Sequence, residues 1–310
     1  MSCISFRKPL YNGFMKPLLL VATLLSLAPL AAISQDETAA DRLGWQVAVH
    51  SYTFKNFSLS NAIDKTAEVG AKYMSISGSV NLMENGKIKT VPTTTLSEKD
   101  YAAILTHMKA KGITPKFVNM GVVKPTANED ESRKLFENAK RLGIDVLVAE
   151  PETHGKMSEL PKVMDVVEKL AVEFNIKVAI HNHPKPSFYW NPDTVLAAVK
   201  GRSPLLGSCS DVGHWVRSGL DPVECLKKLE GRVIALHFKD LVPEKNGKSR
   251  HDVPWGTGKS DVKAMMAELK RQGFKGAFCV EYEYHWDNSV PEIAQCVKFF
   301  NAQCAELAGK

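Results

Sequence analysis

Side chains that can bind metals or transfer protons recur in this sequence at one kind of place, the end of a short apolar run. They gather in the segments 50, 150–152, 181–183, 210–214, 237–240 and 281–283. Carboxylates buried close together repel one another unless a cation joins them, because an unpaired charge is costly to bury. Mixed His and Asp/Glu ligands with an open position suit Mn²⁺, Zn²⁺, Co²⁺ or Fe²⁺ better than Ca²⁺. The pattern therefore indicates a divalent metal site, provided that the fold brings these ends together.

The apolar runs are typical of β-strands, and helix-like stretches separate them. The predicted strands are 46–52, 72–77, 113–119, 145–149, 176–182, 205–210, 232–238 and 276–282. The predicted helices are 60–70, 97–111, 129–142, 158–174, 192–200, 221–229, 260–272 and 290–307. Residues that favour helix starts and helix ends mark several of these boundaries. They are Ser97, Asn191 and Asp221 at the starts, and Gly70, Gly112, Gly143 and Gly273 at the ends.

Eight strand-then-helix units fill residues 35–310 with nothing left over. Continuous apolar strands such as 178–180 fit a parallel sheet that is covered on both faces. The rival fold, a doubly wound open sheet, usually carries a glycine-rich phosphate turn after its first strand, and residues 50–54 contain no glycine. We therefore predict a single-domain (β/α)₈ TIM barrel, an α/β fold in which the carboxyl ends of all strands meet at one mouth.

The first 34 residues have the pattern of a cleaved secretory signal peptide. A basic residue precedes the apolar run 17–33, which is short for a membrane span of ~20 residues. We expect cleavage near Ser34, which would leave residues 35–310 in a secreted or periplasmic compartment without stable membrane insertion. An uncleaved anchor is the alternative, and Met15 is an alternative start.

Charge and cysteine content narrow the class of protein further. The leader carries three of the six net positive charges, and no dense Lys/Arg run lies beside aromatic residues. The sequence therefore gives no indication of nucleic-acid binding. Five cysteines follow the leader without a CxxC pair. Cys296 and Cys304 could pair in an oxidising compartment, but we expect buried apolar side chains instead.

Four motifs at the predicted barrel mouth resemble those of the xylose-isomerase-like TIM barrels. That superfamily contains sugar isomerases and epimerases, inosose dehydratase-type lyases and metal-dependent AP endonucleases. The resemblance covers roughly residues 45–307 and rests on HNHP at 181–184, SDVGHW at 210–215, HFKDL at 237–241 and FCVEYE at 278–283. It implies one divalent metal ion, either Mn, Zn, Co, Fe or Mg.

The resemblance also implies which residues bind that ion. Asp211, His237 and Glu281 take the metal-ligand places on strands six, seven and eight. On strand five many relatives have a Glu, and this chain has His181. We choose Glu150, at the end of strand four, as the fourth ligand, with His181 as the alternative.

Further roles follow from these positions. His183 lies two residues after His181 on the same strand face, which makes it a candidate acid or base. The candidate catalytic residues are His183, Glu150 and Lys239, and the candidate substrate-binding residues are His50, His181, His214 and Trp255. Three of these have structural alternatives: His214 as a turn cap, Lys239 as a surface lysine and Trp255 as a packed loop anchor. Residues 188–190 are aromatic and would suit a lid over a sugar ring.

A metal and a base beside a carbonyl support proton abstraction through an enediolate. We expect a metal-dependent sugar isomerase or epimerase that acts on a small sugar. The sequence leaves the oligomeric state open, and a homo-oligomer is one option. The alternatives are a lyase or hydratase acting on keto-sugars or 3-keto-glycosides, and a non-catalytic periplasmic sugar-binding barrel. An AP endonuclease fits poorly, because those relatives carry three metals and a basic DNA-binding face.

Overall fold

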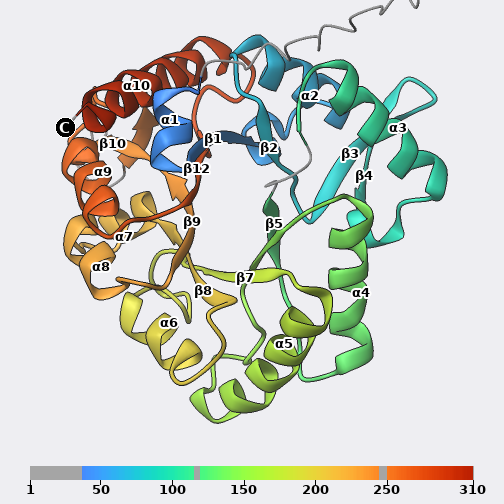
Figure 1. The fold of residues 1–310 in the computed structure, drawn as a ribbon. Coiled ribbons are helices and arrows are strands. Elements are labelled where there is room, and N and C mark those ends of the chain that lie inside the picture. Colours follow the sequence, from blue (N-terminus) through green and yellow to red (C-terminus); the bar gives the residue numbers. More distant parts are fainter. Residues whose placement is uncertain (1–36, 115–118, 244–249, 310) are drawn as a thin grey trace, which may run out of the picture. The chain divides into compact units, whose positions relative to one another are not determined.

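The computed structural model describes residues 37–114, 119–243 and 250–309, without the side chains of 119–121. The predicted leader therefore lies outside the described residues. Eight parallel strands form one sheet that curves into a barrel with helices around it (Figure 1). They are β1 (Trp45–His50), β2 (Tyr73–Ser75), β5 (Asn119–Val123), β6 (Val146–Ala149), β7 (Lys177–His181), β8 (Leu206–Asp211), β9 (Val233–Phe238) and β12 (Gly276–Val280). The predicted TIM barrel is confirmed.

Neighbouring strands of the barrel follow one another in chain order, and β12 pairs with β1 to join the end to the start. Where β2 and β5 close the barrel, Tyr73 forms a parallel β-bridge with Thr114. The N–H of Thr114 donates to the carbonyl of Lys72 at 2.8 Å. The third strand lies later than predicted, at 119–123 instead of 113–119, of which 115–118 lie outside the described residues.

Ten helices occur among the described residues, and most of them cover the outside of the barrel (Figure 1). They are α1 (Ala39–Leu43), α2 (Leu59–Glu68), α3 (Glu98–Ala110), α4 (Glu129–Arg141), α5 (Leu160–Phe174), α6 (Pro192–Val199), α7 (Val212–Arg217), α8 (Pro222–Lys228), α9 (Val262–Arg271) and α10 (Val290–Ala308). The predicted caps are confirmed: Ser97, Asn191 and Asp221 each accept a backbone N–H at a helix start. None of these helices is long and apolar enough to cross a membrane.

Small side chains fill the barrel interior, and larger ones face the helices. Val148, Ala179, Cys209 and Ala235 form one interior cluster, while Ala48, Ala277 and Cys279 form another. The alternate strand residues, such as Leu147 and Ile180, belong to the main core beneath the helices. Cys296 and Cys304 are free and buried, so the possible disulfide between them does not form.

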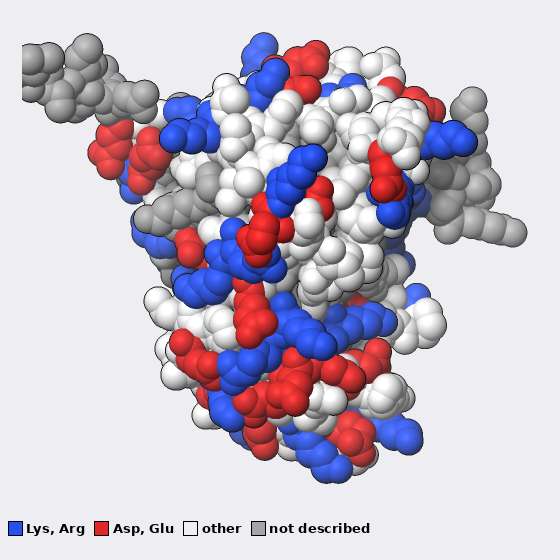
Figure 2. Space-filling model, turned by 90° about the vertical axis from the view of Figure 1, so that its right-hand side faces the viewer, with Lys and Arg blue, Asp and Glu red and all other residues white. Residues whose placement is uncertain are grey.

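The helical surface carries interleaved charges. Figure 2 shows Lys and Arg mixed with Asp and Glu over the side of the barrel where α3 and α4 lie. Arg141 of α4 pairs with Glu98 of α3, and Arg133 of α4 pairs with Glu129 and with Glu173 of α5. Exposed pairs such as these contribute little stability each, so they mainly fix how neighbouring helices align.

Two antiparallel hairpins interrupt the strand-then-helix pattern, so the prediction that eight units fill the chain with nothing left over was wrong. One hairpin is β3 (Ser79–Glu84) with β4 (Lys87–Pro92), and the other is β10 (Asp240–Pro243) with β11 (Arg250–Val253). The first turns at Asn85-Gly86, both with positive φ, which is a common two-residue hairpin signal. Short 3₁₀ helices also occur, at η1 (Ser51–Phe54), η2 (Thr93–Thr95) and η3 (Met157–Glu159).

The loop before α9 is organised by one carboxylate. Asp240 accepts the backbone N–H groups of Gly256, Gly258 and Ser260 at 2.8–3.0 Å. A Cβ atom on Gly258 would lie 2.1 Å from Asp240 Oδ1, so this close approach requires glycine. Trp255 in the same loop is 3% exposed, and its Nε1 donates to the carbonyl of Phe238 at 3.0 Å. The loop is therefore anchored inward.

We predict that Asp240→Ala lowers the free energy of unfolding by at least ~2 kcal/mol, because it leaves several partly buried N–H groups without an acceptor. Urea denaturation followed by circular dichroism measures this. Asp221→Ala is the matched control, because it removes an exposed helix cap worth only ~1 kcal/mol. Equal losses in the two variants would contradict the role given to Asp240.

Candidate metal centre

Parallel strands bring their carboxyl ends to the same mouth, and four predicted site residues meet there. His181 ends β7, Asp211 ends β8, His237 lies near the end of β9, and Glu281 directly follows β12. All four are buried, and each offers a ligand atom within 4.8 Å of the others. The register of the sheet explains this meeting, since Asp211 pairs directly with His237.

Contacts within this four-residue cluster leave a place for a cation. His237 Nδ1 lies 3.1 Å from both His181 Nε2 and Glu281 Oε2, and Asp211 Oδ2 lies 3.7 Å from His181 Nε2. Asp211 Oδ1 accepts the N–H of His214 at 2.7 Å, whereas Oδ2 is buried without a hydrogen-bond partner. A carboxylate oxygen that accepts no hydrogen bond and lies beside two imidazoles and a second carboxylate fits Mn²⁺, Zn²⁺, Co²⁺ or Fe²⁺, and less closely Mg²⁺.

Glu150 lies on the other side of His181, outside the four-residue cluster. Its Oε1 is 3.3 Å from His181 Nδ1 and also forms a hydrogen bond with His183 Nδ1. These three residues make up a second group of possible ligands. The geometry thus favours His181 over our first choice, Glu150, as the fourth ligand. Glu150 instead holds the ring of His181 from behind, as carboxylates often do for metal-binding histidines.

The pKa values in this group reflect mutual pairing. Burial would raise the pKa of Glu150, but hydrogen bonds from His181 and His183 lower it to about 2. Burial would lower the pKa of His181, but Asp211 and Glu150 raise it to about 9. Glu150 is therefore a carboxylate that only accepts, so both imidazoles donate to it through Nδ1.

Lys239 is buried among the carboxylates of the mouth, so its reading as a surface lysine was wrong. Its Nζ lies 2.6 Å from Glu283 Oε2, 2.8 Å from Glu281 Oε2 and 3.3 Å from Asp211 Oδ2. Burial would lower the pKa of Lys239, but these carboxylates raise it well above its usual value. Lys239 therefore acts as a fixed cation and hydrogen-bond donor, not as a base.

His214 is buried beside Asp211, with Nε2 3.4 Å from Asp211 Oδ2. The guanidinium of Arg217 lies 3.1 Å from His214 Nδ1 and 2.9 Å from Glu283 Oε2. Because a guanidinium only donates, His214 Nδ1 accepts and Nε2 carries the proton. Burial lowers the pKa of His214 to about 2, so the ring is a neutral donor. The sequence analysis did not single out Arg217 as a site residue. Arg217 ends α7, and that helix brings its side chain to His214 and Glu283.

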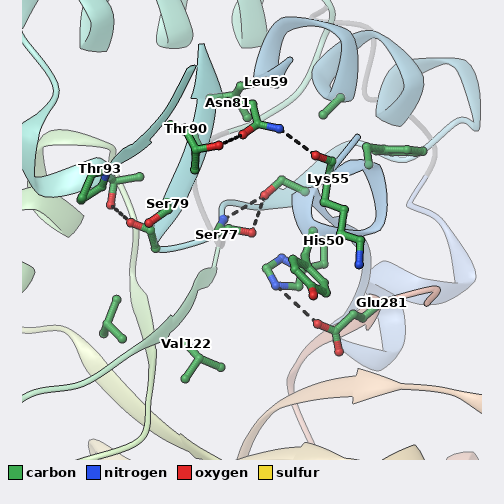
Figure 3. Close-up of a pocket in the computed structure, with 18 of the residues that line it drawn as sticks. His50, Lys55, Leu59, Ser77, Ser79, Asn81, Thr90, Thr93, Val122 and Glu281 are labelled. Carbon is green, nitrogen blue, oxygen red and sulfur yellow. Dashed lines mark hydrogen bonds and ion pairs between the residues drawn. The ribbon is translucent and has the colours of Figure 1, made fainter. Parts of the chain in front are cut away.

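A cavity of about 790 Å³ opens beside the four-residue cluster. His50, His183, His214, Glu281 and Glu283 line its inner end. Figure 3 shows His50 facing Glu281 there, with a 3.6 Å separation between Nε2 and Oε1, and the β3–β4 hairpin on the opposite side. His183 is the most open of the predicted site residues at this end, with 46% of its side chain exposed.

The predicted aromatic contacts do not lie in this cavity. Trp255 packs edge-on against Phe238 in the core, as the packed-anchor alternative describes, so it cannot stack on a sugar in this position. Tyr189 is also buried, with its hydroxyl donating to the carbonyl of Pro151. Residues 188–190 are absent from the described lining of the cavity, so the lid prediction does not match their placement.

A family model described as the xylose isomerase-like TIM barrel matches residues 63–303. The chain therefore belongs to the xylose isomerase-like TIM barrel family. By sequence it is similar to an inosose dehydratase of Lactiplantibacillus plantarum, with 27% identity over 158 residues, or 46% of this chain and 52% of that protein. The chain thus spans about half the length of that dehydratase.

Solved structures extend the likeness to nearly whole chains. A protein of Parabacteroides distasonis is 35% identical, with a TM-score of 0.64 over 83% of this chain and 98% of that one. A xylose isomerase-like TIM barrel protein of Mycobacterium smegmatis in complex with magnesium is 14% identical, with a TM-score of 0.66 over 87% and 98%. A D-allulose 3-epimerase of Methylomonas sp. is 14% identical, with a TM-score of 0.63 over 84% and 98%. The last two likenesses show the fold alone.

We predict that Glu281→Gln removes most of the bound divalent metal, because the amide is a much weaker ligand than the carboxylate. Elemental analysis of protein reconstituted with Mn²⁺ or Zn²⁺ measures this. Glu283→Gln, two residues along and outside the four-residue cluster, is the matched control and should retain the metal. Unchanged metal content in Glu281→Gln would contradict the ligand assignment.

We further predict that metal affinity rises with pH. The pKa of His181, raised to about 9 without metal, means that binding at Nε2 must displace a proton. Below pH 9, affinity should therefore increase about tenfold per pH unit. Calorimetric titration in buffers of different ionisation enthalpy would count the proton released. Affinity that is flat between pH 6 and pH 8 would exclude His181 as a ligand.

Proposed function

We propose that this protein is a divalent-metal-dependent sugar isomerase or epimerase. The observation that carries the proposal is that one cavity is lined both by Glu281, a member of the buried His181–Asp211–His237–Glu281 cluster, and by the accessible imidazole of His183. A divalent ion held by that cluster would polarise a sugar carbonyl and its neighbouring hydroxyl, and so stabilise the enediolate that proton removal creates. Family membership supports the same class of chemistry.

His183 is our candidate base. Its Nδ1 donates to the Glu150 carboxylate, which leaves Nε2 with a free lone pair. The ring lines the cavity, so Nε2 is available to accept a proton from a carbon next to the carbonyl. Glu150 orients the ring and stabilises the imidazolium that forms, as a carboxylate does for a histidine base elsewhere.

His214 would position the substrate from the other side, because its ring lines the cavity. Its Nε2–H is a donor near Asp211, and the buried ammonium of Lys239 adds positive charge behind it. Such donors favour the negative charge that develops on a substrate oxygen as the proton leaves. Return of the proton to the other carbon would isomerise the sugar, and return to the other face would epimerise it.

A lyase or hydratase acting on a keto-sugar or 3-keto-glycoside is the second candidate. The sequence likeness to an inosose dehydratase favours it. It would use the same proton abstraction, followed by loss of a β-substituent that a donor such as the Nε2–H of His214 could assist. A secreted or periplasmic location, proposed from residues 1–34, would favour free or glycosidic sugars over phosphorylated ones.

Deuterium exchange tests the shared step. Metal-loaded protein in D₂O should introduce deuterium next to the carbonyl of at least one hexose or 3-keto-glycoside, as detected by NMR. An unsaturated product would identify the lyase, and a rearranged or inverted sugar the isomerase or epimerase. Binding without any exchange across the panel would instead indicate the third alternative, a non-catalytic sugar-binding barrel.

We predict that His183→Ala lowers the exchange rate by about 10²–10⁴-fold, the usual contribution of a general base. Its metal content should stay unchanged, since His183 lies outside the four-residue cluster. His154→Ala is the control, because that imidazole is 76% exposed and is not part of the described cavity lining. Full exchange activity in His183→Ala would assign the base elsewhere.

A further inference from the structure

The cavity continues well beyond the residues that the proposed chemistry needs. Its volume of about 790 Å³ lies in the upper part of the ~300–1,000 Å³ range of small-molecule pockets, and such pockets enclose ligands larger than one monosaccharide. The inner end is formed by the strand ends described above. The outer end is formed by η1 and the β3–β4 hairpin, and we call it the outer subsite, lined by Tyr52, Lys55, Asn81, Thr90 and Thr93.

The wall of the outer subsite is fixed in advance. Asn81 Nδ2 donates to the carbonyls of Lys55 at 2.7 Å and Phe57 at 3.0 Å, which ties the hairpin to the segment after η1. Asn81 Oδ1 accepts the Thr90 hydroxyl at 2.6 Å, and the Thr93 hydroxyl donates to the carbonyl of Gly78 (Figure 3). The Thr93 oxygen is buried and also accepts Asn138 Nδ2 at 2.8 Å, so the exposed Thr90 hydroxyl is the one whose oxygen can still accept from a ligand. It suits a ligand that brings its own hydroxyl donor.

An aromatic pair stands at the edge of the same subsite. Tyr52 is 39% exposed, which is unusual for a large ring in this protein, and it lines the cavity. Trp286 meets it edge-on, with ring centroids 5.7 Å apart. The ammonium of Lys55 lies 3.5 Å from the Trp286 ring centroid and has no carboxylate partner among the described residues. An exposed ring beside an ammonium group and a fixed acceptor offers both an apolar and a polar contact to one ligand.

The position of Tyr52 matches a second sugar ring rather than a second independent site. Its ring centroid lies 6.3 Å from that of His50, which belongs to the inner end. A ligand that contacts His50 and Glu281 therefore leaves the neighbouring space beside Tyr52 for whatever is joined to it. A pyranose ring has an apolar C–H face for Tyr52 and a hydroxyl for the Thr90 oxygen.

We propose that the outer subsite binds a second sugar ring, so that the substrate is a disaccharide-sized glycoside and not a free monosaccharide. This inference rests on the proposed sugar chemistry for the orientation of the ligand. It assigns Tyr52 as the stacking residue that determines this specificity, in place of the buried Trp255. It also gives the β3–β4 hairpin a function, because the hairpin closes the side of the cavity where the second ring lies.

Calorimetric titration tests the proposal with defined probes. Mn²⁺-loaded protein is titrated with methyl α- and β-D-glucopyranoside and with maltose, cellobiose and trehalose. At least one disaccharide should bind about tenfold more tightly than the methyl glycosides, the factor that corresponds to ~1.4 kcal/mol. Tyr52→Ala should remove that gain without weakening methyl glycoside binding, and Tyr52→Phe should retain it.

Equal affinity for both classes of probe, or an equal loss for both in Tyr52→Ala, would overturn the inference. The outcomes also separate it from the proposed function. If methyl glycosides and disaccharides bind alike while keto-sugars still exchange deuterium, only the outer subsite falls. If disaccharides bind through Tyr52 but no keto-sugar exchanges, only the isomerase proposal falls. If none of the probes binds, the outer subsite falls, and the deuterium-exchange experiment alone decides the isomerase proposal.

Discussion

The carboxylates of Asp211 and Glu281 are buried in the mouth of the barrel, and the neighbouring side chains are arranged around their negative charge. Neither group can remain ionised in such a place without a positive partner nearby. Lys239 supplies one, with Nζ within 3.3 Å of an oxygen from each. His181, whose pKa is raised to about 9, supplies another in the absence of metal. Without metal these two cations balance the two carboxylates, and a divalent ion held by the cluster would take the place of the His181 proton.

Glu150 extends this arrangement outward by one layer. Its carboxylate holds two imidazoles at once, His181 on the metal side and His183 on the cavity side. Donation through Nδ1 leaves Nε2 of each ring directed at a different task, metal binding in one case and proton transfer in the other. Glu150 therefore orients both the proposed metal ligand, His181, and the proposed base, His183. This explains why Glu150 itself is neither a metal ligand nor the base.

The sequence predicts the barrel well because its signals are local. Apolar runs, caps such as Ser97 and glycine ends such as Gly112 each depend on a few neighbouring residues, and they place nearly every barrel strand and its helix. The sequence analysis did not predict the β3–β4 hairpin, because β4 is mostly exposed and shows little alternation of apolar and polar residues. Asn85-Gly86 is nevertheless a recognisable turn signal.

The sequence predicts which residues meet at the site, but it predicts their individual roles less well. Asp211, His237 and Glu281 converge because strand ends must converge in a closed barrel. The choice between Glu150 and His181 depends on side-chain direction across two strands, which spacing alone does not give. Trp255 was misplaced for a similar reason: its loop is turned inward by Asp240, a contact between residues on either side of a hairpin.

In the proposed enzyme, the residues for proton chemistry and the residues that bind the rest of the substrate come from different parts of the barrel. The charged residues come from β6 to β12, where barrel closure fixes their positions, whereas the outer subsite comes from η1 and an inserted hairpin after β2. Asn81 fastens that hairpin to the segment after η1 and is not part of the charged cluster. Substrate size can therefore change through the hairpin without disturbing the balance of charge around Asp211. This separation gives a physical reason why one fold can hold the same proton chemistry against ligands of different length.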